Sequence, residues 1–221
     1  MNEPDVTLTD FALAVEAAVF AGLLLGRSTP RSVLRLCFAL FFGAVCAATL
    51  TGGIVHGFLA DSPWEIGWWK ASLVTAGLAT LAQCAAGAEM LFAPRIARWI
   101  EGIASIQFIF YVGVIVFISQ NFLIAVAANV PATLFLLAAF VIMSRRISSG
   151  RALAGAAGMA LTLVSGTLQQ LKIGVHERYF NHNALYHLNQ CVALALIYLG
   201  ACCVLNRMLP GGIHGHAPAI S

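Results

Sequence analysis

The chain has 221 residues, of which 60% are hydrophobic and only 10% are charged, with a formal net charge of +3 and a mean hydropathy of +0.88. A soluble domain carries about 25% charged residues, so this chain cannot cover itself with a water-facing surface. The composition excludes an ordinary soluble protein and predicts an all-α integral membrane protein with the bilayer as its partner. The basic residues are spread over short loops, which argues against binding to nucleic acid.

Seven apolar stretches follow one another along the chain, each near the roughly 20 residues that a helix needs to cross the hydrocarbon core. They lie at residues 8–26, 33–58, 66–92, 103–119, 122–143, 152–173 and 184–205. Lipid offers the backbone no hydrogen-bond partners, so we expect each stretch to be a helix. The chain is thus predicted to form a single seven-helix transmembrane domain over residues 1–221, with 209–221 as a flexible C-terminal tail.

Two of these stretches contain residues that shape a helix or its packing. In the second stretch, Gly53 and Gly57 form a small-xxx-small pattern around His56, which predicts that a neighbouring helix comes close to the backbone there. In the fifth stretch, Pro131 follows Asn129 and predicts a kink.

Basic residues divide unevenly between the two ends of the predicted helices. With seven spans, only Lys70, Lys172 and Arg178 fall at the end that holds the N-terminus. The other end carries Arg27, Arg31, Arg35, Arg95, Arg98, Arg145, Arg146, Arg151 and Arg207. Because short loops rich in Lys and Arg stay in the cytosol, we expect the N-terminus outside and the C-terminus in the cytosol. The acidic start, MNEPD, argues against a signal peptide, and the expected location is a bacterial inner membrane.

Polar and ionisable residues gather near the predicted outer ends of the helices. His56 lies near the end of the second helix, and Asn183, His187 and Gln190, spaced i, i+4, i+7, share one face of the seventh. Glu16 lies roughly 10 Å inside the first helix. An ionisable group at the bilayer centre costs about 2.5–3.5 kcal/mol, so such groups face the bundle and find partners. The pattern predicts a small polar cavity between the second, third and seventh helices.

Imidazoles contributed by separate helices are common ligands of zinc. The candidate metal ligands are His56, His187, Asn183 and His182. A zinc ion with one open position activates a bound water, and a nearby carboxylate then serves as general base. The candidate catalytic carboxylates are Asp61, Glu65 and Glu16. A lipid amide or ester, its acyl chain in the bilayer, would suit such a cavity.

The stretch NHNALYHL, residues 181–188, resembles the last-helix motif of the CREST superfamily, which includes alkaline ceramidases, adiponectin-type receptors and Per1-like lipid-remodelling proteins. This resemblance implies a seven-helix membrane protein with a zinc site, in which one histidine comes from helix two and two, spaced i, i+4, from helix seven. His56 and His187 match two of these histidines. The resemblance also implies hydrolysis of a lipid amide.

The chain departs from the CREST motif at three positions. Asn183 stands where the first histidine of helix seven is expected, although His182 is adjacent. Gly52 stands at the position of a serine one turn before the helix-two histidine. The aspartate near helix three has only Asp61 and Glu65 as counterparts by region.

Two classes of function follow from this reading. The first is a zinc-dependent membrane hydrolase of a lipid amide or ester, with its site at the outer ends of helices two, three and seven. The second is a non-catalytic, receptor-like or ligand-binding protein that keeps a polar pocket, in which His56 and His187 only find hydrogen-bond partners. Transport or a proton relay through Glu16, His56, His187 and Gln169, and a haem held between the two histidines, are further alternatives.

Overall fold

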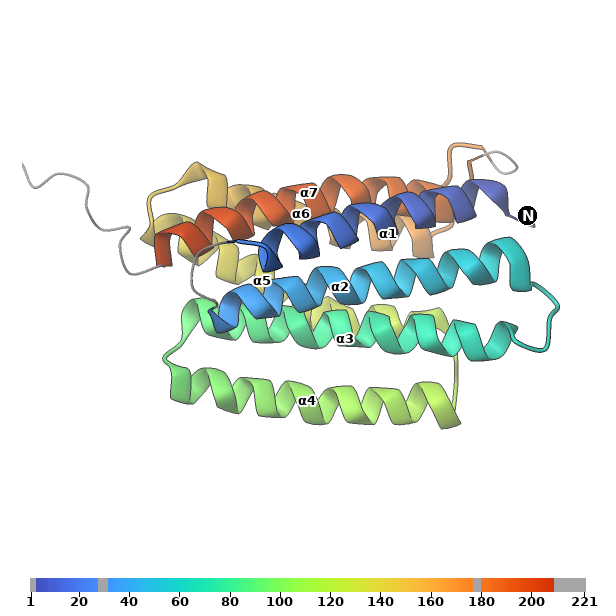
Figure 1. Cartoon of the computed structure of the whole chain (residues 1–221), viewed down its shortest axis with the longest axis horizontal. Coiled ribbons are helices and arrows are strands. Elements are labelled where there is room, and N and C mark those ends of the chain that lie inside the picture. The colour runs from blue at the N-terminus through green and yellow to red at the C-terminus, as the bar shows by residue number, and fades with distance from the viewer. Residues whose placement is uncertain (1–2, 28–31, 177–179, 209–221) are drawn as a thin grey trace, which may run out of the picture.

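The computed structural model describes residues 3–27, 32–176 and 180–208. Its helices are α1 (Pro4–Leu25), α2 (Val33–Ile54), the π-helical turn η1 (Val55–Leu59), α3 (Glu65–Leu91), α4 (Pro94–Phe117), α5 (Phe122–Arg146), α6 (Gly150–Gln170) and α7 (His182–Met208) (Figure 1). Within these ranges no strand occurs, apart from an isolated bridge between His176 and Phe180. Two of the basic residues on which the predicted orientation rests, Arg31 and Arg178, and the predicted flexible tail 209–221 lie outside the described residues.

Each of the seven long helices has the length and composition of a membrane span. They contain between 21 and 27 residues, counting η1 as the continuation of α2. At 1.5 Å per residue the shortest is about 31 Å long, which matches a hydrocarbon core about 30 Å thick. The prediction of an all-α chain with seven long apolar helices is therefore confirmed.

α4 is longer than its apolar stretch predicts. It begins at Pro94 rather than near residue 103 and has 24 residues. Proline suits the first turn of a helix because its missing N–H would find no partner there. The first turns also contain Arg95, Arg98 and Glu101, and a search for apolar runs stops where such charges begin.

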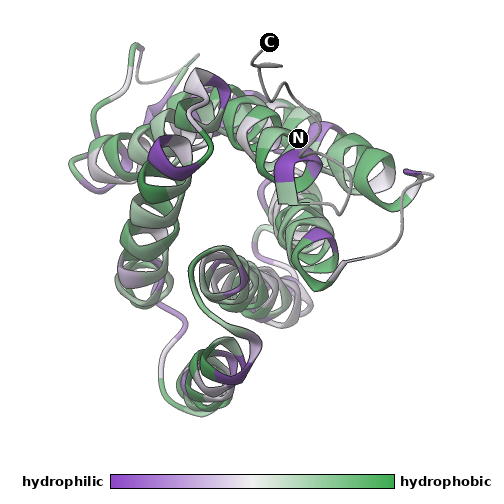
Figure 2. Ribbon diagram, turned by 90° about the vertical axis from the view of Figure 1, so that its left-hand side faces the viewer, coloured by the Kyte–Doolittle hydropathy of each residue, from purple (hydrophilic) through white to green (hydrophobic). Residues whose placement is uncertain are grey.

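Six of the helices form a ring, and α4 lies outside it. Neighbours in the ring pack in the order α1, α2, α3, α5, α6, α7, and α7 returns to α1. Figure 2 looks along the bundle at this ring, and Figure 1 shows α4 at the edge of the molecule beside α3. The interior of the ring is therefore available for a site built from six helices.

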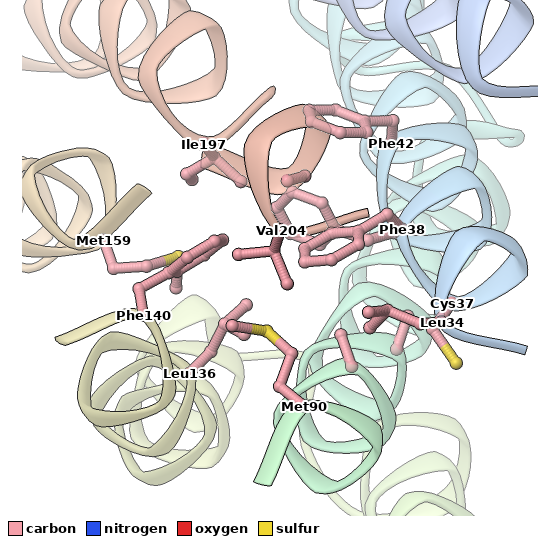
Figure 3. Close-up of a cluster of buried hydrophobic side chains, with 14 of the residues drawn as sticks. Leu34, Cys37, Phe38, Phe42, Met90, Leu136, Phe140, Met159, Ile197 and Val204 are labelled. Carbon is pink, nitrogen blue, oxygen red and sulfur yellow. The ribbon is translucent and has the colours of Figure 1, made fainter. Parts of the chain in front are cut away.

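One end of the ring interior is filled with large apolar side chains. They come from the start of α2 and α6 and from the far ends of α3, α5 and α7 (Figure 3). The cluster includes Leu34, Phe38, Phe42, Met90, Leu136, Phe140, Met159, Ile197 and Val204. The opposite end, which holds η1 and the start of α7, carries polar side chains instead. The interior of the bundle is therefore packed with apolar side chains at one end and lined by polar ones at the other.

Glycines bring α1 against the end of α2. A Cβ on Gly57 would lie 2.8 Å from Thr7 Cγ2, and one on Gly53 would lie 2.9 Å from Phe11 Cε1. Only glycine allows such an approach, as the small-xxx-small pattern around His56 predicts. The neighbour is α1, and its polar residues are thereby carried next to those of α2 and η1.

Candidate functional site

A cavity of about 380 Å³ occupies the polar end of the ring. All six ring helices line it, whereas the sequence predicted a cavity between helices two, three and seven only. On α7 the lining runs from His182 to Leu194, about 18 Å along the helix axis. Spread over that length, the volume makes a narrow chamber. Its polar and titratable lining residues include Asp10, Thr49, His56, Ser72, Thr80, Gln83, Asn129, Thr162, Gln169, His182, Asn183, Tyr186, His187 and Gln190.

Asp10 of α1 and His187 of α7 form a buried titratable pair in the wall of the cavity. His187 Nε2 lies 3.2 Å from Asp10 Oδ1, and both side chains are almost completely buried. His187 Nδ1 lies 3.2 Å from the Thr9 hydroxyl oxygen, so α1 contacts both ring nitrogens. The first and last helices of the chain are thus joined at this point.

The hydrogen bonds of Thr9 indicate which ring nitrogen of His187 carries a proton. The Thr9 hydroxyl lies 2.9 Å from the Asp5 carbonyl oxygen and 3.0 Å from that of Val6, to which it donates. Its oxygen can then accept from Nδ1–H of His187. Nε2 faces Asp10 Oδ1, and a hydrogen bond there requires a further proton, on the ring or on the carboxyl group. The pair therefore holds a proton between an acid and a base in a buried site.

His56 is held by a second carboxylate from the same helix end. It lies in η1, and its Nδ1 is 2.6 Å from Glu3 Oε2. This pair is more open than the first, since the His56 side chain is 25% exposed and that of Glu3 is 45% exposed. The His56 ring also meets the edge of Trp69, at 6.1 Å between ring centres, and Trp69 donates to the Gln120 carbonyl oxygen. π-Helical turns are frequent at functional sites.

Asp10 Oδ2 is buried and has no hydrogen-bond partner among the described residues. Its neighbours are the backbone of Gly52 and the hydroxyl of Ser72. A Cβ on Gly52 would lie 3.5 Å from Asp10 Oδ2 and 3.4 Å from Ser72 Oγ. Ser72 Oγ already donates to the Ala48 carbonyl oxygen at 2.8 Å. Two oxygen atoms with free acceptor capacity therefore meet where α2 has no side chain.

A second polar level lies deeper in the cavity. Thr162 of α6 pairs with Gln190 of α7 at 3.2 Å, which leaves the other end of the buried Gln190 amide without a partner among the described residues. On the opposite wall, Thr80 of α3 pairs with Asn129 of α5 at 3.1 Å. The cavity thus keeps hydrogen-bonding groups about one helical turn below His187.

The predicted metal ligands do gather at the cavity. His56, His187, Asn183 and His182 all line it. Asn183 is already engaged, because its Oδ1 accepts from Gln169 Nε2 at 3.2 Å. The stripe of Asn183, His187 and Gln190 read from the sequence therefore does face the chamber.

The predicted catalytic carboxylates Asp61, Glu65 and Glu16 are not among the residues that line the cavity. Glu65 Oε2 accepts from the backbone N–H of the exposed Asp61 at 2.8 Å, so these two acids close the loop between η1 and α3. Glu16 lies deeper on α1 and its carboxyl group pairs with Cys191 of α7. The carboxylate beside His187 is Asp10, which sequence reasoning passed over because Glu16 lies deeper in the same apolar run. The sequence feature that pointed to Asp10 is an acid in the outer turns of α1. The glycines near the end of α2 allow this helix to pack closely against them.

The donors at the site match zinc in kind but do not by themselves complete a zinc site. Nδ1 of both His56 and His187 meets an oxygen atom, which is how second-shell partners orient a metal-bound histidine. Against this, His187 Nε2 is turned to Asp10. In the part of the chain that the structure describes, no group of three or more His, Cys, Asp and Glu side chains is placed to hold a metal ion.

Seven long apolar helices, six of them around a chamber with polar groups in its wall, define the class: a helical bundle suited to a membrane, with its candidate site near one end. Within that class the chain belongs to DUF6962, a family of unknown function, whose pattern matches residues 6–205. The matched range includes Asp10, His56 and His187. Neither the curated proteins nor the solved structures provide a match to the chain.

Proposed function

We propose that this chain is a multi-pass membrane protein that takes a membrane lipid, or a ligand of similar build, into the central chamber. The head of the ligand meets Asp10, His56 and His187, and its chain follows the narrow apolar part of the cavity. The observation that carries this proposal is the pairing of a long, narrow chamber with a buried carboxylate oxygen, Asp10 Oδ2, that finds no partner in the described part of the chain. Ligand sites are mostly apolar with a few placed polar groups.

The proposed orientation puts the N-terminus and the chamber on the outer side of a bacterial inner membrane. The uneven distribution of Lys and Arg supports it, because basic loops remain in the cytosol. Lys70 at the chamber end donates to the Val116 carbonyl oxygen at the end of α4, so this cation has a structural partner.

Binding of a fluorescent monoacylglycerol to the purified protein in nanodiscs tests the proposal. Ala76 lines the cavity on α3, whereas Ala71 on the same helix is exposed and does not. We expect Ala76→Phe to weaken binding by about tenfold or more, since the added ring occupies the chamber, and Ala71→Phe to leave it unchanged. Equal binding by both variants, with melting temperatures like that of the parent, would sink the proposal.

A zinc-dependent hydrolase of a lipid amide or ester is a second candidate. The observation that favours it is the oxygen partner on Nδ1 of both histidines, the arrangement that orients a metal-bound histidine, although a metal at His187 Nε2 would have to take the place of its contact with Asp10. Zinc bound there would polarise a carbonyl group and activate a water.

Metal analysis of protein purified without added metal separates this candidate from simple ligand binding. Zinc near one ion per chain, lost in both His56→Ala and His187→Ala along with cleavage of a lipid amide, would support the hydrolase. A metal-free protein that still binds the monoacylglycerol would favour a ligand-binding protein without catalytic activity. An absorption spectrum of the same sample shows at once whether haem is present.

A further inference from the structure

Resting on the proposed lipid site, we infer that the head of the ligand is an uncharged hydrogen-bond donor, such as a hydroxyl group, and that Asp10 Oδ2 is the atom that binds it. A lipid whose head only accepts hydrogen bonds, or carries a negative charge, is disfavoured. This assigns a ligand chemistry to the chamber and makes Asp10 a specificity-determining residue.

Asp10 Oδ2 is a buried acceptor that has no hydrogen-bond partner among the described residues. Asp10 is 3% exposed, lines the cavity, and has its Oδ1 engaged by His187. Oδ2 remains an acceptor whether the carboxyl group is ionised or carries its proton on Oδ1. A buried acceptor without a partner is unfavourable, and a donor on the ligand removes that cost.

The surroundings of Oδ2 favour a donor as well. Ser72 directs its hydroxyl hydrogen to the Ala48 carbonyl oxygen, so toward the cavity it too presents an acceptor. Gly52 places no side chain between the two oxygens and the chamber. Any larger residue would cover them, since a Cβ at this position sits within 3.4–3.8 Å of both groups. At this point of the cavity wall, the two acceptor oxygens favour a ligand that donates.

The charges around the chamber oppose an anionic head. Each histidine at the inner site faces an acid, Asp10 for His187 and Glu3 for His56, so these four groups sum to zero or less. His182 also lines the cavity, and histidine is mostly neutral at pH 7. No Lys or Arg lines the cavity among the described residues. A carboxylate or phosphate head would find two acids and no permanent cation.

A ligand series with one common chain tests this inference. Oleyl alcohol donates, methyl oleate only accepts, oleate is anionic and oleylamine is cationic, and each competes against the bound fluorescent monoacylglycerol. We expect the alcohol to compete about tenfold better than the ester and better still than oleate, since a hydrogen bond to a buried acceptor separates them. Equal competition by alcohol and ester, or a preference for oleate or for oleylamine, overturns the inference.

Variants locate the preference on the named oxygen. Asp10→Leu, close to Asp in shape, removes the acceptor and should abolish the preference for alcohol over ester. Gly52→Ala keeps Asp10 and fits at ordinary contact distances, yet covers Oδ2, so it should reduce the same preference if Asp10→Leu fails to fold. Gly43→Ala on the same helix has open space and serves as the control. A preference unchanged in Gly52→Ala overturns the assignment to Oδ2. Failure of the monoacylglycerol to bind at all refutes the lipid site itself, so the two failures are distinguishable.

Discussion

Asp10 Oδ1 and His187 Nε2 lie 3.2 Å apart although 176 residues separate them in the chain, and this contact joins the first helix to the last. It closes the ring of helices beside the chamber. Both side chains are almost fully buried, so neither finds water as a replacement partner. Loss of one partner from a buried pair is costlier than loss of both, because the remaining group stays unpaired.

We predict that Asp10→Asn and His187→Gln are not additive in their effect on stability. The double variant should be less destabilised than the two single effects together, with a coupling energy of about 0.5–3 kcal/mol, because each single change leaves the other group without its partner. Thermal unfolding in detergent, followed by circular dichroism, measures the four forms of the cycle. Additive effects would show that the two groups do not interact in the folded protein.

The pair formed by Glu3 and His56 should behave differently. Its side chains are 45% and 25% exposed, so water competes for both groups. Glu3→Gln is expected to change the free energy of unfolding by about 0–1 kcal/mol, less than either change at the buried pair. The same melting experiment checks this, and a larger loss for Glu3→Gln would contradict the difference in burial.

Gly57→Ala should weaken the contact between α1 and α2. The added Cβ would meet Thr7, a fully buried β-branched side chain whose hydroxyl is held by the Glu3 carbonyl oxygen. Because this neighbour is stiff, we expect a loss of about 1–3 kcal/mol. Gly43→Ala in the same helix has nothing within 4 Å and should keep the parental stability or raise it slightly. Equal melting temperatures for the two variants would argue against the close approach.

Gly158→Ala should separate α6 from α7. Its Cβ would lie 2.6 Å from the Ala193 carbonyl oxygen and 2.9 Å from the Ile197 backbone nitrogen. Backbone atoms cannot rotate away, so the helices must move apart, and the loss should reach about 1–3 kcal/mol or more. Gly166→Ala, on the same helix and in open space, is the matched control. The comparison uses unfolding in detergent, and a stable Gly158→Ala would refute this packing.

Cysteine labelling in intact bacterial cells tests the proposed orientation of the chain in the membrane. Pro63 lies in the exposed loop after η1, and Gly150 lies exposed at the start of α6. With the chamber outside, a membrane-impermeant maleimide should label Pro63→Cys in intact cells and Gly150→Cys only after lysis. The parent chain, whose six free cysteines are buried or half-buried, sets the background. The opposite pattern would invert the proposed topology.

The seven helices could be read from the sequence because each is a long apolar run and the membrane environment leaves few alternatives. The helix boundaries were harder to predict from the sequence, since α4 begins among charged residues that a search for hydrophobic runs leaves out. His56 and His187 could be found because polar side chains in apolar helices are costly and stand out. Asp61 and Glu65 do not line the chamber, because closeness in sequence to His56 says little about where a side chain lies once the loop after η1 has folded.

Composition and apolar runs alone determined the helical class, the number of long helices and the face of α7 that turns inward, since all of these depend on local pattern and on the solvent. The tertiary structure decided which carboxylate meets His187. That choice depends on how closely α1 packs against Gly53 and Gly57, a contact between distant segments whose consequences for Asp10 no local pattern contains. It also decided that the acceptor Oδ2 remains without a partner within residues 3–27, 32–176 and 180–208, because burial and hydrogen bonding arise only when six helices close around a common space.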